Sequence, residues 1–164
     1  MNYWITMHWP RFVGETEPRN GVWVQDGKKK VISPLIAGHL IFIYESRSGP
    51  TTIDDDGSPL QRQTGAGGIV ALVKATDGVS EGDLKPTKYA NGKRLWWRWY
   101  VPTKSTPEKG FLPRAGVARI LGYSRNYTFR GFGEDHSGLM QIDKEAFDKI
   151  LASFRQYKAE KISR

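Results

Sequence analysis

A tryptophan, a glycine and a run of cations occur together within a short span near the N-terminus. Gly21-Val22-Trp23 follows an aromatic segment at residues 3–10 and precedes the lysine run 28–30. An indole offers a flat face on which a nucleobase can stack, and ammonium groups can hold the phosphates outside the stack. Glycine beside the ring permits a tight backbone turn at a pocket mouth. These residue types, at this spacing, indicate a pocket for an extruded, modified nucleobase.

The charge of the chain is distributed unevenly. Residues 1–82 hold 8 Lys and Arg against 9 Asp and Glu, whereas residues 83–164 hold 17 against 8, and the net charge of the whole chain is +8. A basic excess confined to one half favours a polyanionic partner, most simply nucleic acid. Ordinary solubility charge is the alternative reading.

Length and composition bound the class of protein. A chain of 164 residues with six Trp fits one folded domain and not a disordered segment. No apolar run approaches the ~20 residues of a membrane span, so no membrane partner is expected. There is no Cys, which excludes disulfides and fits a cytoplasmic protein, and the N-terminus lacks a signal-peptide pattern.

Hydrophobic patterning predicts more strand than helix. Strands are predicted at residues 3–7, 40–44, 68–74 and 95–101. In the last of these, Trp96, Arg98 and Tyr100 share a face that we expect to be wet or to contact a ligand. The stretch 46–67 is long for a loop in a compact domain, so it is either a mobile hairpin tip or a functional loop.

Three helices are predicted, and the last is the clearest. Asp143 can cap a helix that runs to about Tyr157, and two short helices are expected within 28–37 and 111–121. The apolar stripe of the last helix is Ala146, Phe147, Ile150, Leu151 and Phe154. We predict an α+β fold: a small mixed β-barrel with flanking helices and a C-terminal helix, formed by residues 1–164 as a single domain.

The order of these motifs resembles a known group of domains. It comprises the aromatic strand, Gly21-Val22-Trp23, the segment 38–46, the glycine-led strand 68–74, Trp97-Arg98-Trp99, Phe129-Arg130-Gly131-Phe132 and a closing helix. This set is similar to the PUA-like superfamily, specifically its EVE and YTH branches, over nearly the whole chain.

The resemblance implies a function as well as a fold. Members of these branches extrude a nucleotide and hold its base in an aromatic cage. Trp23 matches the cage tryptophan, and His8 and Trp9 match the end of the first strand, which borders the pocket. The chain departs from the EVE pattern at His8-Trp9-Pro10 and at residues 24–30, and these departures leave the identity of the base open.

The candidate site residues fall into two groups. The base-binding candidates are Trp23, Trp9, His8, Val24, Tyr44, Ser46 and Trp96. The phosphate-binding candidates are Lys28, Lys29, Lys30, Arg125 and Arg130. Each has a structural alternative: the tryptophans can pack in the core, the lysine run can be a solvated turn, and Arg130 can pair with Glu134 or Asp135.

No catalytic constellation is recognisable in the sequence. With no Cys and three His, a zinc deaminase site lacks ligands. The phosphate loop and the nucleophile elbow are absent, and the acidic run 54–56 has no spaced partner for a cation. We therefore expect no catalytic residue, metal or cofactor, and any cleavage would come from an effector domain or subunit, a nuclease or an NTPase.

Three functions remain open from the sequence. The first is a reader of a methylated base in DNA, as the specificity module of a modification-dependent restriction system. The second is an EVE- or YTH-type reader of a modified base in RNA. The third is a non-catalytic protein-interaction domain, which requires that the tryptophans are buried and that no concave basic site exists.

Overall fold

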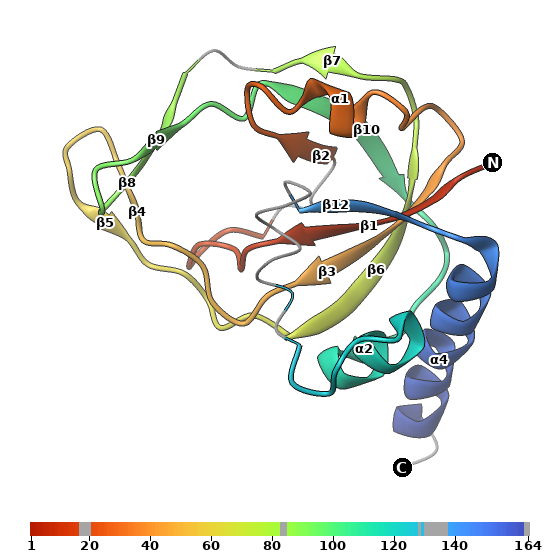
Figure 1. Cartoon of the computed structure of the whole chain (residues 1–164). Coiled ribbons are helices and arrows are strands. Elements are labelled where there is room, and N and C mark those ends of the chain that lie inside the picture. The colour runs from red at the N-terminus through yellow and green to blue at the C-terminus, as the bar shows by residue number, and fades with distance from the viewer. Residues whose placement is uncertain (17–20, 83–84, 128, 130–137, 163–164) are drawn as a thin grey trace.

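A curled sheet forms the body of the molecule, and a second, small sheet extends from one end of it (Figure 1). The computed structural model describes residues 1–16, 21–82, 85–127, 129 and 138–162. The large sheet has the strand order β12-β1-β3-β6-β10-β2, with β11 paired to β6 and β7 paired to β10. The small sheet has the order β5-β4-β8-β9. Only the β1–β3 pairing is parallel among the described strands.

The elements have the following bounds. The strands of the large sheet are β1 (Tyr3–His8), β2 (Gly21–Val24), β3 (Leu40–Glu45), β6 (Gly68–Ala75), β7 (Ser80–Glu81), β10 (Trp99–Ser105), β11 (Leu112–Pro113) and β12 (Leu139–Ile142). Those of the small sheet are β4 (Thr52–Ile53), β5 (Pro59–Leu60), β8 (Thr87–Tyr89) and β9 (Arg94–Leu95). The helices are α1 (Lys29–Ile32), α2 (Arg114–Leu121) and α4 (Lys144–Ile162).

Strand β3 shows why the predicted buried runs are apolar throughout. Its residues alternate between two hydrophobic clusters, because successive side chains of a strand point to opposite faces. Phe42 and Tyr44 belong to the cluster that contains residues of α2 and α4, whereas Ile41 and Ile43 belong to the cluster that contains β2 and α1 residues. Figure 1 shows α2 and α4 together on one side of the sheet. The predicted strands at 3–7, 40–44 and 68–74 are confirmed as β1, β3 and β6.

The C-terminal helix begins where the sequence predicts. The Asp143 carboxylate accepts a hydrogen bond from the Ala146 amide at 2.7 Å, which satisfies one free N–H of the first turn. Phe147, Ile150 and Phe154 of the predicted stripe are buried. The helix continues to Ile162, beyond the predicted end. The expected short helices are also present as α1 and α2, the latter starting directly after Pro113.

The predicted strand 95–101 is wrong, because it is two strands. Residues 96–98 cross from β9 in the small sheet to β10 in the large one. Their carbonyls bond to other segments: the Asp26 amide donates to the Trp96 oxygen at 2.7 Å and the Gly82 amide to the Arg98 oxygen at 2.5 Å. Long-range backbone bonding therefore overrides the local strand preference.

The long stretch 46–67 is a hairpin built on β4 and β5. The Asp54 carboxylate closes its turn by accepting hydrogen bonds from the Asp56 and Ser58 amides, both at 2.9 Å. Asp55 pairs with Lys85 at 3.0 Å. The acidic run thus has a local structural role. Within the described residues, no helix combines the length and apolarity that crossing a bilayer requires.

A buried Trp–His pair ties β1 to the turn before β3. The Trp4 indole donates to Nδ1 of His39 at 3.1 Å, so this nitrogen must carry no proton. Burial lowers the pKa of His39 from its ordinary value of 6.5. The unfolded chain therefore binds the His39 proton more readily than the folded one.

We predict that the free energy of unfolding falls when His39 becomes protonated at acidic pH. The His39 contribution is fully present above pH 6.5 and is lost as the pH falls through the lowered folded pKa. His39→Gln should cost about 1 kcal/mol at neutral pH and flatten this acid slope. Urea unfolding of the unaltered protein and of His39→Gln between neutral and mildly acidic pH measures this effect. If the free energy of unfolding depends equally on pH in both proteins, His39 is not the titrating group.

Candidate nucleic-acid interface

A cavity of about 1740 Å³ lies between the ends of β1 and β3, the β2 strand and the small sheet. The start of α2 also contributes to its lining through Pro113, Arg114 and Ala115. Six of the predicted site residues line it: His8, Trp9, Trp23, Lys28, Tyr44 and Ser46. The cavity thus brings together residues that are distant in sequence.

The charged groups of the cavity are almost all cationic. The one carboxylate among the described lining residues, Asp55, is held by Lys85, which lowers the pKa of Asp55. The cationic lining residues are Lys28, Arg47, Arg62, Lys88, Lys93 and Arg114. Such a concave basic surface attracts polyanions. Its presence contradicts the requirement of the protein-interaction alternative that no such site exists.

Trp23 is the exposed aromatic ring at this cavity. It lies opposite Tyr100 in the β2–β10 register, and the two rings stack with centroids 5.9 Å apart and an interplanar angle of 19°. The residue stays 41% exposed. A β-carbon added at Gly21 would lie 3.0 Å from the indole, so the glycine provides the space that the ring occupies. Stacking on Tyr100 fixes the orientation of Trp23 and leaves part of the ring accessible.

Trp9 contributes a second aromatic group to the lining. Its ring meets Tyr89 and Trp97 edge to face, at 5.9 and 5.6 Å between centroids. The Trp97 indole donates to the Tyr89 hydroxyl at 3.2 Å. These contacts join the end of β1 to the small sheet, and all three rings line the cavity.

Arg62 holds the same junction with its guanidinium. It donates from Nε to the Pro50 carbonyl at 2.9 Å, from Nη1 to the Pro10 carbonyl at 2.8 Å, and from Nη2 to the Thr52 hydroxyl at 2.9 Å. Its charge also lies over the rings of Trp9 and Phe12. Burial lowers the pKa of Arg62, which reflects its removal from water. Arg62 therefore fixes the hairpin to the segment that follows β1.

The floor of the cavity is formed by the ends of β1 and β3. Tyr44 is 3% exposed, and its ring packs against that of Phe129 at a tilt of 32°, with centroids 4.9 Å apart. Burial raises the pKa of its hydroxyl, although Arg114 and Arg47 oppose the shift, so the phenol is protonated at neutral pH. The Ser46 hydroxyl lies 2.8 Å from the Ser48 carbonyl oxygen, to which it donates. Both ring nitrogens of His8 are buried.

Other predicted residues do not reach this cavity. Val24 is 0% exposed and packs in the core, so its side chain cannot contact a base. Trp96 is 42% exposed but lies outside the lining. Lys29 and Lys30 also lie outside it, and the Lys29 ammonium is 4.5 Å from the Trp99 ring centroid.

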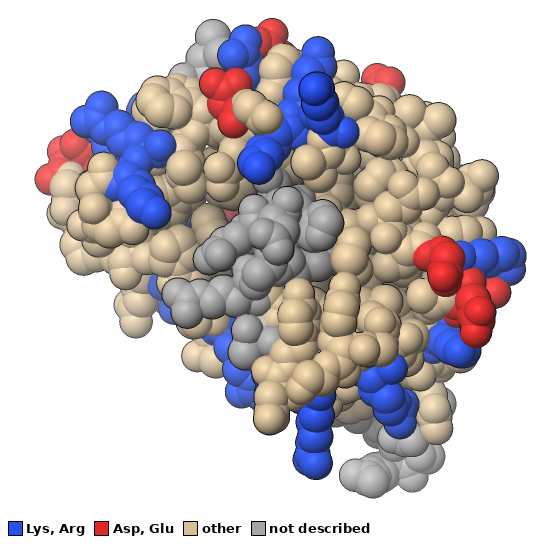
Figure 2. Space-filling view, viewed as in Figure 1, with Lys and Arg blue, Asp and Glu red and all other residues tan. Residues whose placement is uncertain are grey.

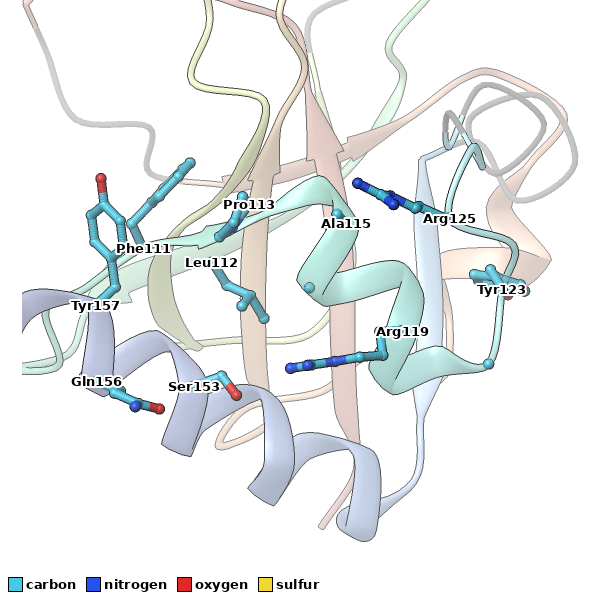
Figure 3. A pocket seen from close by; sticks show the side chains of 12 residues that line it. Phe111, Leu112, Pro113, Ala115, Arg119, Tyr123, Arg125, Ser153, Gln156 and Tyr157 are labelled. Atoms are coloured by element: carbon cyan, nitrogen blue, oxygen red, sulfur yellow. The ribbon is translucent and has the colours of Figure 1, made fainter.

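Neither of the two predicted phosphate-binding arginines is among the described lining residues of the large cavity. Arg125 lines a different cavity of about 660 Å³, which lies between α2, the segment 111–113 and α4 (Figure 3). Figure 3 shows Arg119 extending from α2 across this second cavity. Arg130 lies outside the described residues.

Several lining residues are not recognised from the sequence. Arg47, Arg62, Lys88, Lys93 and Arg114 are scattered over loops and short strands, with no local motif to group them. The alternation of side chains in β2 is a usable signal, because neighbours in a strand face opposite ways. It separates exposed Trp23 from buried Val24. Among the described residues, no cluster of three or more His, Asp or Glu could hold a metal.

Comparison with solved structures supports the fold. The human protein THYN1, in complex with 5-methylcytosine-containing DNA, has a TM-score of 0.53 at 14% identity, with 93% of this chain and 96% of that chain covered. The chain therefore shares the fold of THYN1, a mixed α+β architecture with a curled sheet and a C-terminal helix. The predicted α+β barrel with flanking and C-terminal helices is thereby confirmed.

Two further solved structures are similar at a lower TM-score. A protein from Agrobacterium tumefaciens has a TM-score of 0.48 at 15% identity, with 93% of this chain and 92% of that chain covered. A protein from Rhodopseudomonas palustris has a TM-score of 0.49 at 14% identity, with 94% and 93% covered. No family model and no curated protein sequence matches this chain.

Replacement of Gly21 tests the support of the Trp23 ring. Gly21→Ala places a methyl 3.0 Å from the indole and 3.2 Å from the Val101 carbonyl, so the ring must shift. We expect about tenfold weaker nucleic-acid binding, equivalent to ~1.4 kcal/mol. Gly78→Ala is the control, because nothing lies within 4 Å of its added β-carbon. Fluorescence anisotropy measures both, and equal affinities would contradict this role of Gly21.

Replacement of Arg62 tests the junction. Arg62→Met keeps much of the apolar stem but removes the donors to Pro10, Pro50 and Thr52. We expect a loss of about 3 kcal/mol in the free energy of unfolding, since hydrogen bonds from charged groups contribute ~1.5–3 kcal/mol each and solvent replaces some of them. Exposed Arg94→Met is the control. If the free energy of unfolding in urea is the same in Arg62→Met as in the unaltered protein, Arg62 does not stabilise this junction.

Proposed function

We propose that this protein reads a modified base in DNA by stacking an extruded nucleotide against Trp23. The observation that carries the proposal is an exposed indole, stacked on Tyr100, at a cavity whose described lining residues include six cations and one carboxylate. The ring supplies a surface for a base. The cations supply partners for the phosphates on either side of it.

The magnitudes are compatible with this mechanism. Base–aromatic stacking contributes ~1–3 kcal/mol, and extrusion from a duplex costs a few kcal/mol. Stacking alone therefore does not offset extrusion, so phosphate contacts are needed as well. Burial of one methyl group adds ~0.8 kcal/mol, which is about a fourfold preference. Hydrogen bonds from polar groups of the cavity must then identify the base itself.

Two polar groups are well placed for that task. The protonated Tyr44 hydroxyl lies at the cavity floor, and Gln25 lines the cavity two residues after Trp23. Both can donate and accept hydrogen bonds, which suits recognition of a base edge. Asp26 is less suited, because its carboxylate pairs with Arg98 at 3.3 Å.

The resemblance to THYN1 supports DNA as the first ligand to test. That protein was solved with DNA containing 5-methylcytosine, and it shares this fold. We infer that residues 1–164 form one domain that binds without cutting, as the specificity module of a modification-dependent restriction system. A nuclease or NTPase in another domain or subunit would act on the DNA.

Trp23→Ala is predicted to abolish selectivity for the modified base. Affinities are measured for matched DNA strands that carry cytosine, 5-methylcytosine, 5-hydroxymethylcytosine, adenine or N6-methyladenine. The unaltered protein should prefer one modified strand by about fourfold or more. Trp96→Ala is a matched control, because that ring is equally exposed but lies outside the cavity lining. It should keep the preference.

Two results would count against the proposal. Equal affinity of the unaltered protein for every strand in the panel would remove the reading function. A preference that survives in Trp23→Ala would place the recognised base elsewhere. Competition with matched RNA strands addresses the RNA alternative, since tighter RNA binding would point to contacts with the 2′-hydroxyl.

A further inference from the structure

The hairpin formed by β8 and β9 carries two of the cations on which the proposed function draws. We call residues 87–95 the hairpin arm. Lys88 and Lys93 line the large cavity, and Arg94 is exposed on the adjoining strand. None of the ion pairs between described residues involves these three side chains.

The register of the arm places two like charges opposite each other. Lys88 pairs directly with Arg94 in the β8–β9 ladder, so their side chains leave the same face of the hairpin. Like charges at such a pair destabilise a sheet. The nearby carboxylate of Asp55 forms its ion pair with Lys85, and its weaker attraction to Lys88 offsets only part of this repulsion. The pair costs stability in the free protein, which is expected where cations await an anionic ligand.

The arm is fixed to the body of the protein. Tyr89 is buried, pairs with Thr52 in the β4–β8 ladder, and accepts a hydrogen bond from the Trp97 indole. Thr52 in turn accepts from Arg62. Because these contacts hold the arm in place, its backbone needs no further ordering when an anion binds.

Cations also stand on the other side of the cavity. Lys28 lines it from the turn between β2 and α1, close in sequence to Trp23. Figure 2 shows Lys and Arg side chains gathered over the small sheet at the left and over α1 at the top. A strand whose base stacks on Trp23 continues in both directions from that nucleotide, and the two groups of cations can contact its phosphates on either side.

We propose that the hairpin arm is a second phosphate-binding surface, which holds the nucleic-acid backbone on the side of the cavity opposite Lys28. This inference rests on the proposed function, because it needs a nucleic acid in the cavity. Its contribution differs from that of Trp23. Phosphate contacts add affinity whatever the base, whereas the pocket distinguishes one base from another.

The salt dependence of binding tests the arm. The variant Lys88→Gln/Lys93→Gln is compared with Lys104→Gln/Lys109→Gln, which removes the same charge from exposed positions outside the cavity. On duplex DNA, each lost phosphate contact lowers the slope of log K against log salt by about 0.9. The arm variant should therefore lose about 1.8 from the slope, and the control variant should keep the slope of the unaltered protein.

The arm variant should also keep its preference for the modified strand and its thermal stability. Removal of the charge opposite Arg94 should leave the midpoint of unfolding unchanged or raise it. Weaker binding with unchanged preference and a reduced slope supports the arm. If the salt slope of the arm variant equals that of the control variant, the arm is not a phosphate-binding surface. In that case the reading function still stands, provided that selectivity depends on Trp23.

The two proposals can also fail in the opposite way. If the arm variant loses affinity and slope but the unaltered protein shows no preference among bases, the arm is supported and the reading function fails. If the unaltered protein binds no DNA or RNA at all, both are overturned.

Discussion

Arg62 donates three hydrogen bonds across the junction between the segment after β1 and the hairpin of β4 and β5. The cavity depends on this junction, because one of its sides belongs to the large sheet and another to the small sheet. Two-residue strands such as β4 and β5 have little stability of their own. A partly buried guanidinium, with edge-to-face contacts among Trp9, Tyr89 and Trp97, fixes them instead.

On the β2 side, too, a few contacts fix an aromatic ring of the cavity. Trp23 has one neighbour that orients it, Tyr100, and one that makes room for it, Gly21. An exposed indole costs hydration free energy in the absence of a ligand. Held in one orientation, it presents a surface that a base can cover without further ordering of the protein. Rigid aromatic surfaces and fixed cations thus complement one another around the cavity.

The sequence predicts the helices and strands better than it predicts the contacts between them. Apolar runs identified β1, β3 and β6, and Asp143 marked the start of α4, because these signals are local. The break at residues 96–98 was missed, since it depends on backbone bonds to Asp26 and Gly82. Likewise, nothing near Lys88 or Lys93 in sequence shows that they face the same cavity as Trp23. Only the folded register brings them together.

The central claim is that a base stacks on Trp23, and ¹⁹F NMR of protein labelled with 5-fluorotryptophan tests it most directly. Replacement of each tryptophan in turn assigns the six resonances. Titration with DNA carrying the preferred modified base should shift the Trp23 resonance strongly and leave that of buried Trp4 in place. A Trp23 resonance that stays unchanged while the protein binds this DNA would contradict the account.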